Sequence, residues 1–220
     1  SANVAFSVLS LNSTVVINVN DTYFGDDVTI VVIVPNDAKG NVILTVGSHV
    51  YNLTIEDGMG SITLHGPEIG TYLVTASYLG DDKYNPAETS KSFEVMQNTF
   101  TRLQELIEDA SDLLTLDRDY YGDGTPVTIS KTITINGNGH TLNAHGVSRI
   151  FHITAGSVVI NNLTFVNGFT DSDGGAVYFD LGSTGIVTDC NFTNNSADED
   201  RGAVYVKGLD CKIYNSTFTD

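Results

Sequence analysis

A short motif that recurs near the end of the chain constrains the fold more than any other feature. Residues 174–178 (GGAVY) return 27 positions later as residues 201–205 (RGAVY). A second motif of alternating apolar and polar residues occurs three times, at 160–167, 187–194 and 213–220. A period of this length is typical of stacked repeats, in which each unit covers the apolar face of its neighbour. The short β-type runs, with Gly and Asn between them, favour a parallel β-solenoid over a helical repeat.

The repeat also predicts which residues meet in successive coils. Phe165, Phe192 and Phe218 fall 27 and 26 residues apart, so we expect one internal column of rings with coils about 4.8 Å apart. Asn167 and Asn194 follow two residues after the first two rings, where their side chains can hydrogen-bond along the stack.

The region from about 116 to 220 supplies about three and a half coils of this kind. Residues 148–153 align with residues 174–179 at an offset of 26. Because Asp220 falls in the middle of a repeat, we expect the solenoid to continue in the natural protein. The Ser1-Ala2 start likewise indicates a cut inside a longer gene product.

Composition and charge exclude several classes of protein. The chain is 41% hydrophobic, which is enough for a sizeable core, and its 27 acidic against 10 basic residues give a net charge of −17. Such a field repels phosphate backbones, so we expect no nucleic-acid partner. No apolar run reaches about 18 residues, so no part of this sequence is expected to span a membrane. We recognise no signal peptide.

The two cysteines give no sign of a disulfide or a zinc site. In the repeat register, Cys190 and Cys211 lie about five residues apart along the strand direction, roughly 16 Å at the rise of a strand. This separation exceeds the reach of a disulfide. We therefore predict two free thiols that belong to the core.

The first module, residues 1–96, reads as an antiparallel β-sandwich. Short β-branched or aromatic runs alternate with Gly, Asn, Asp and Pro turn signals, a spacing typical of a sandwich or small barrel. The expected strands are 14–19, 28–34, 42–46, 51–55, 61–64, 72–78 and 92–95. The absence of a cysteine pair and of tryptophan from these residues argues against an antibody-type domain.

The second module, residues 97–220, begins with a predicted helix at about 102–112. Apolar residues at helical spacing support it, and Thr101 with Gln104 matches a capping box. A solenoid end leaves core and strand edges uncovered, so we interpret this amphipathic helix as the N-terminal cap of the solenoid. A helix that binds a partner is the alternative.

The first module resembles the bacterial Ig-like domains of cell-surface proteins, most of which are spacers or stalks. The residues that carry the resemblance are 23–26 (YFGD), 70–72 (GTY), 78–84 (YLGDDKY) and 92–95 (SFEV).

The second module resembles right-handed parallel β-helices of the pectate-lyase type, and above all the adhesin-like surface proteins of methanogenic archaea. The resemblance rests on residues 100–107 (FTRLQELI), on residues 133–141 (ITINGNGHT), and on the repeated GGAVY and Phe-x-Asn motifs, which are also similar to chlamydial polymorphic outer-membrane proteins. An Ig-like module beside such a β-helix fits this family, which implies an extracellular protein.

A polysaccharide lyase or hydrolase is the main alternative, because several β-helix proteins of this type are such enzymes. Lyases resemble one another in pairing calcium-binding carboxylates with an Arg or Lys base; the basic candidates here are Arg149, Arg201, Lys207 and Lys212. The acidic candidates are Asp171, Asp173, Asp198, Glu199 and Asp200. A hydrolase needs two carboxylates about 5–9.5 Å apart, which Asp173 and Asp200 would supply. Asp is also an ordinary turn residue, and we therefore predict no catalysis.

The loop at residues 117–124 (DRDYYGDG) suggests calcium but lacks the spacing and final Glu of an EF-hand. We interpret it as a solvated loop and assign no catalytic, cofactor-binding or metal-binding residue; calcium stays the one candidate cofactor. The five histidines form no cluster, and we interpret His140 as structural. Seven Asn-x-Ser/Thr sequons occur, of which we expect Asn12, Asn20 and Asn194 to be accessible.

Together these features predict a fragment of a large adhesin at the outer cell surface and not an enzyme. The Ig-like module would be a spacer, and the β-helix would present a repetitive surface to another cell or a glycan. A purely structural stalk is the third possibility. Aromatic side chains exposed along one face would favour glycan contact, since sugars stack on them; Tyr178 and Tyr205 are the candidates.

Overall fold

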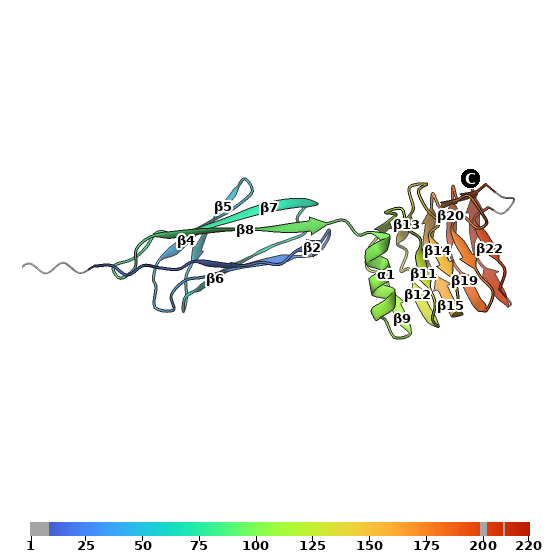
Figure 1. Ribbon diagram of the computed structural model, residues 1–220, viewed down its shortest axis with the longest axis horizontal. Coiled ribbons are helices and arrows are strands. Elements are labelled where there is room, and N and C mark those ends of the chain that lie inside the picture. Colours follow the sequence, from blue (N-terminus) through green and yellow to red (C-terminus); the bar gives the residue numbers. More distant parts are fainter. Residues whose placement is uncertain (1–8, 199–201, 209) are drawn as a thin grey trace, which may run out of the picture. The chain divides into compact units, whose positions relative to one another are not determined.

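The computed structural model describes residues 9–198, 202–208 and 210–220. The chain divides into two compact units, Ser1–Gln97 and Asn98–Asp220, each with its own buried core. The first consists of antiparallel and mixed sheets and the second is a parallel β-solenoid preceded by one helix (Figure 1). The predicted fold class is therefore confirmed. In the described part of the chain, no helix is long and apolar enough to cross a membrane.

The first unit encloses its core between two sheets, of order β1-β3-β6 and β2-β8-β7-β4-β5. The strands alternate buried and exposed residues, as in β3, where Val28, Ile30 and Val32 point inward. Among the described residues, the strand pairings are antiparallel except that of β2 with β8, and an isolated parallel bridge joins Leu11 to Tyr84. The strands are β1 Val16–Asn18, β2 Thr22–Tyr23, β3 Val28–Ile33, β4 Asn41–Val46, β5 His49–Thr54, β6 Met59–Leu64, β7 Gly70–Tyr78 and β8 Ala87–Met96.

The helix α1 (Phe100–Asp109) begins with Thr99 as its N-cap, whose hydroxyl accepts the Arg102 N–H at 3.3 Å. The predicted capping box of Thr101 and Gln104 is therefore wrong, and the helix begins and ends earlier than expected. Both threonines precede the apolar pattern, so spacing alone does not distinguish them. Only Thr99 has the extended backbone that an N-cap needs.

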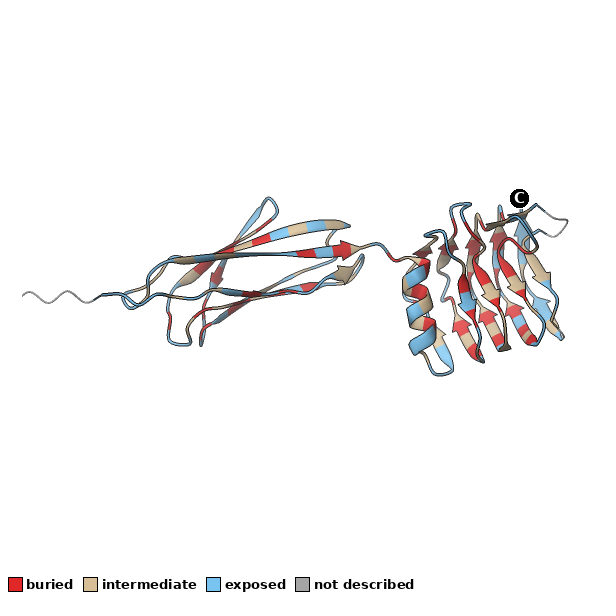
Figure 2. Ribbon diagram, in the orientation of Figure 1, coloured by how far each residue is buried: buried red, intermediate tan, exposed pale blue. Residues whose placement is uncertain are grey.

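Gln104 instead satisfies the edge of the solenoid. Its Oε1 accepts the N–H of Thr128 at 2.7 Å, and its Nε2 donates to the carbonyl of Thr128 at 3.0 Å. An amide side chain thus takes the place of a neighbouring strand. The side of α1 that faces the solenoid buries Phe100, Leu103 and Ile107 against the solenoid core, while exposed residues cover the outer side (Figure 2).

The solenoid has three main faces, each a parallel sheet whose strands come from successive coils. Their orders are β10-β13-β16-β20-β24, β11-β14-β18-β22 and β23-β19-β15-β12-β9, with a short pair β17-β21 at one corner. The strands are β9 Leu113–Thr115, β10 Tyr120–Tyr121, β11 Val127–Ile129, β12 Ile133–Asn136, β13 Thr141–Asn143, β14 Phe151–Ile153, β15 Gly156–Asn161, β16 Thr164–Val166, β17 Phe169–Thr170, β18 Val177–Phe179, β19 Ser183–Thr188, β20 Asn191–Thr193, β21 Ser196–Ala197, β22 Val204–Val206, β23 Cys211–Tyr214 and β24 Thr217–Thr219.

The predicted column of rings is present. Phe192 pairs with Phe165 on one side and Phe218 on the other, at centroid distances of 4.7 and 4.6 Å with nearly parallel planes. The predicted asparagine contact is confirmed as well, because Asn194 Nδ2 donates to Asn167 Oδ1 at 2.6 Å. The repeat therefore set the register of the coils correctly.

Both cysteines are free, as predicted. Cys211 pairs with Gly185 of β19, which lies five residues before Cys190 along the chain. Cys190 is buried, and this burial raises the pKa of its thiol to about 11. It is thus a core side chain with little thiolate at neutral pH.

Candidate functional site

The sheet β11-β14-β18-β22 carries an aromatic column on its outer surface. His152 is the middle residue of β14 and Tyr178 that of β18, and both point outward because the residues beside them in each strand are buried. The register places Tyr178 opposite His152 and Tyr205 of β22 opposite Tyr178. We call His152, Tyr178 and Tyr205 the aromatic column; each side chain is partly exposed.

The three rings contact one another along the solenoid axis. The centroids of His152 and Tyr178 are 5.2 Å apart in an edge-to-face arrangement, and those of Tyr178 and Tyr205 are 5.2 Å apart with planes tilted by 36°. Both geometries lie within the range of favourable aromatic pairs. The column is therefore a packed row whose rings hold one another in place.

Arg149 lies over the same column. Its guanidinium carbon is 4.8 Å from the centroid of Tyr178, a cation–π contact. The guanidinium also donates to the carbonyl oxygens of Gly174, at 2.9 Å, and Asp173, at 2.6 Å. Burial lowers the pKa of Arg149, but a guanidinium stays protonated in proteins. These bonds attach the arginine to the loop before β18, and a protonated guanidinium cannot act as a proton acceptor.

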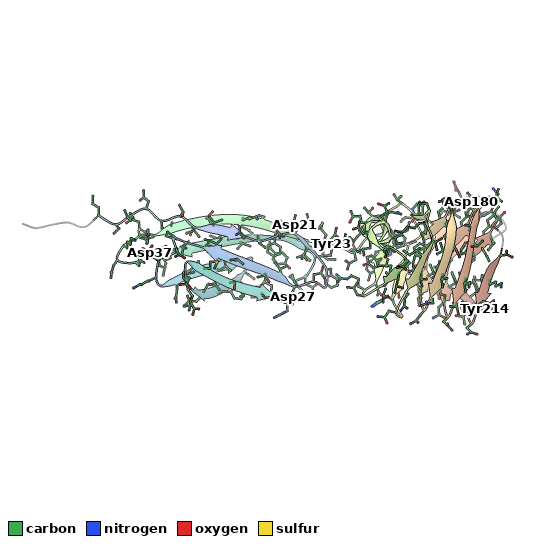
Figure 3. The ribbon with its side chains drawn as sticks, turned by 90° about the horizontal axis from the view of Figure 1, so that it is seen from below. Asp21, Tyr23, Asp27, Asp37, Asp180 and Tyr214 are labelled. Atoms are coloured by element: carbon green, nitrogen blue, oxygen red, sulfur yellow. The ribbon has the colours of Figure 1, made fainter. Side chains whose placement is uncertain are left out.

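Asp180 lies beside the column and faces two basic groups. Its carboxylate oxygens are 3.8 Å from Nε2 of His152 and 3.9 Å from Nζ of Lys207. Burial, and then the positive charge of Arg149, lower the pKa of His152. The imidazole is therefore neutral at pH 7. Asp180 is labelled at the edge of the solenoid in Figure 3.

The other residues considered for catalysis are only partly described by the structure. Lys212 lies on β23, which belongs to a different sheet from β22, the strand that Lys207 follows. Glu199, Asp200 and Arg201 lie outside the described residues, and so does any pairing of Asp173 with Asp200. Asp171 and Asp198 are exposed.

The acidic loop at residues 117–124 uses its carboxylates within the protein. Asp117 binds Arg118, which lowers the pKa of that carboxyl. Asp119 accepts the N–H of Thr141 at 2.8 Å and lies 3.2 Å from Nδ1 of His140. A third carboxylate, that of Asp123, accepts the Thr101 N–H at 3.0 Å. Among the described residues, no group of three or more His, Cys, Asp or Glu side chains could hold a metal ion.

The sequons are more accessible than expected. Asn12, Asn20 and Asn194 are exposed as predicted, but so are the other four sequon asparagines, Asn52, Asn162, Asn191 and Asn215. Asn52 and Asn191 face outward on strands, and Asn162 and Asn215 lie at bends with positive φ. Asn194, in contrast, uses one amide N–H to bind Asn167.

His152 is the member of the aromatic column that the sequence reasoning missed. The alignment of residues 148–153 with 174–179 already placed it above Tyr178, 26 positions earlier. The histidine was missed because histidines were considered only as metal ligands or catalytic groups, and not as aromatic rings.

The fold defines this chain as a β-solenoid protein with an N-terminal β-sandwich unit, and the surface feature that stands out is a row of aromatic side chains on a rigid sheet. No family model, curated protein or solved structure matches it.

Proposed function

We propose that this chain is a segment of an extracellular adhesin, similar to the adhesin-like surface proteins of methanogenic archaea. In this proposal the first unit is an Ig-like spacer, and the second is a pectate-lyase-type β-helix that contacts a glycan or another cell. The net charge of −17 and the seven exposed sequon asparagines are consistent with a protein of the outer cell surface.

The aromatic column is the observation that carries the proposal. Tyrosine combines an apolar ring with a hydroxyl, so it suits a ligand with both C–H faces and hydroxyl groups. Three rings in one row, on strands that cannot move independently, form a preorganised surface. The nearby arginine is bound to backbone carbonyls, so the surface is better suited to contact than to proton transfer.

Binding to immobilised glycans tests this function. We expect the wild-type chain to bind at least one glycan and Tyr205→Ala to weaken binding by about tenfold, which corresponds to about 1.4 kcal/mol. Tyr214→Ala is the matched control, because Tyr214 is 49% exposed but lies on β23, in another sheet. Equal effects of the two substitutions, or no binding, would contradict the proposal. Shortened glycan chains in mass spectrometry would instead identify a lyase or hydrolase.

A further inference from the structure

A shallow groove follows one corner of the solenoid, apart from the aromatic column. Its volume is about 300 Å³, at the small end of ligand pockets. The side chains that line it come from three successive coils: His145 after β13, Asn167 and Phe169 after β16, and Asn194 and Ser196 after β20. None of them belongs to the aromatic column.

The backbone gives this corner the same conformation in each coil. His145, Asn167 and Asn194 have φ angles of 53°, 53° and 52°, in the left-handed region. Asparagine is among the few residues that adopt this region readily. The strand pair β17-β21 continues the register by placing Phe169 opposite Ser196. The groove is thus part of the repeat and not an irregular loop.

The amides in the groove are held in fixed orientations. Asn194 Nδ2 donates to Asn167 Oδ1 at 2.6 Å, and Asn167 Nδ2 donates to Asn143 Oδ1 at 3.1 Å. The same Asn143 oxygen accepts the N–H of His145 at 2.9 Å. A side-chain amide has two N–H donors and two acceptor lone pairs, so Asn167 and Asn194, the two amides that line the groove, each keep donor and acceptor capacity for a ligand after these bonds.

The described lining of the groove contains no acidic residue, lysine or arginine, although the chain as a whole is strongly acidic. Phe169 and His145 add ring faces beside the amides and the Ser196 hydroxyl. A charged ligand would lose hydration here without meeting an opposite charge. A ligand with many hydroxyl groups would find both donors and acceptors, beside apolar surface for its C–H groups.

We propose that this groove binds an uncharged saccharide. The class of ligand rests on the proposed function, which is contact with a glycan. The groove is a second binding site, at a different position from the aromatic column. Because none of the described lining residues is Asp, Glu, Lys or Arg, we expect the groove to prefer uncharged sugars over uronates and amino sugars.

Nuclear magnetic resonance of the ¹⁵N-labelled chain tests the site directly. The probes are cello-, manno- and N-acetylchito-tetraose, with tetragalacturonate and chitosan tetramer as charged counterparts. We expect at least one uncharged probe to shift the side-chain amide resonances of Asn167 and Asn194, and the charged probes to leave them in place. No shift with any uncharged probe, or shifts only with a charged one, would overturn the proposal.

Matched variants locate the binding. Asn194→Asp introduces a charge into the groove and should weaken binding by about tenfold or more. Asn191→Asp is the control, because Asn191 is exposed outside the groove and its side-chain oxygen accepts the Thr217 hydroxyl, as a carboxylate also can. If Asn194→Asp unfolds the corner, as circular dichroism would reveal, Ser196→Asp places a charge in the same groove from an exposed position. Equal affinities for the variants in the groove and the control would refute the site.

Tyr205→Ala separates this inference from the proposed function. We expect that variant to bind at the column about tenfold more weakly while the amide shifts of Asn167 and Asn194 persist. Loss of both signals together would mean that the groove is not an independent site.

Discussion

The two units use β-structure in different ways. In the sandwich unit, β4 and β5 form a hairpin and β7 pairs with both β4 and β8, so neighbouring strands run antiparallel and bring unlike residues together. In the solenoid, each strand pairs in parallel with its counterpart one coil away, and like residues stack, as in the column of three phenylalanines. The first core depends on many different contacts, whereas the second depends on the same contact made repeatedly.

Phe192→Ala should have the largest effect, because its ring is buried between two others. We expect a loss of about 3–5 kcal/mol in the free energy of unfolding of the solenoid, measured by urea titration. Phe218→Ala is the matched control. That ring is 51% exposed and stacks on one neighbour, so its loss should be much smaller.

The corresponding substitution in the sandwich sharpens the contrast. Phe93 is buried and stacks on Tyr72 at 5.1 Å, within a core separate from that of the solenoid. Phe93→Ala should lower the stability of the first unit and leave the solenoid transition unchanged. A shared transition that moves with either substitution would show that the two cores are not independent.

Replacing one glycine in each unit by alanine should lower the stability less than the Phe192 substitution, and by different amounts in the two units. Gly156 has φ +88°, and an added Cβ would lie 2.4 Å from the carbonyl carbon of Lys131 in the preceding coil. Gly47 has φ +57° with open space around it. Gly47→Ala should therefore cost only the left-handed strain, about 1–2 kcal/mol, and Gly156→Ala clearly more. Thermal unfolding of both variants measures the difference, and equal costs would argue against close stacking of the coils.

The smallest effect concerns acid stability in the sandwich. Asp81 accepts the backbone N–H groups of Lys39, Lys83 and Tyr84, with Lys39 the largest contribution, and these bonds lower its pKa to about 2. The folded-state pKa is below the unfolded value of about 3.9. The carboxylate therefore stabilises the fold above that value, and the contribution is lost as the pH falls from about 4 to about 2.

Asp81→Asn tests that assignment. The difference in stability between wild type and variant should be present at pH 5 and shrink by pH 2, when unfolding of the first unit is followed by circular dichroism. A difference that stays constant over this range would mean that the charge of Asp81 does not contribute.

Sequence alone predicted those parts of the molecule that depend on periodicity. The column of Phe165, Phe192 and Phe218 and the contact of Asn194 with Asn167 follow from one register, which the repeat determines. Elements of only two residues, such as β2 and β10, were missed because they are too short to show a pattern. The N-cap of α1 depends on which of two threonines has extended backbone, and the sequence does not show this.

The candidate sites were also predictable only in part. Tyr178 and Tyr205 were predicted as a pair, but the outward direction of Tyr178 follows from the burial of its strand neighbours, and that of Tyr205 from its pairing with Tyr178. The amide groove was not predicted as a site, because its side chains come from turns of three coils that the sequence separates by more than 20 residues.

The side-chain amides of Asn143, Asn167 and Asn194 form a hydrogen-bonded row that is electrically polar along the solenoid axis. Each amide donates toward the coil before it, from Asn194 to Asn167 and from Asn167 to Asn143. The dipoles of the side chains therefore point the same way and add, and each bond polarises the next. A linear chain of sugars lying along this row would meet the same electrical polarity at every coil, so one of its two orientations would be preferred over the other.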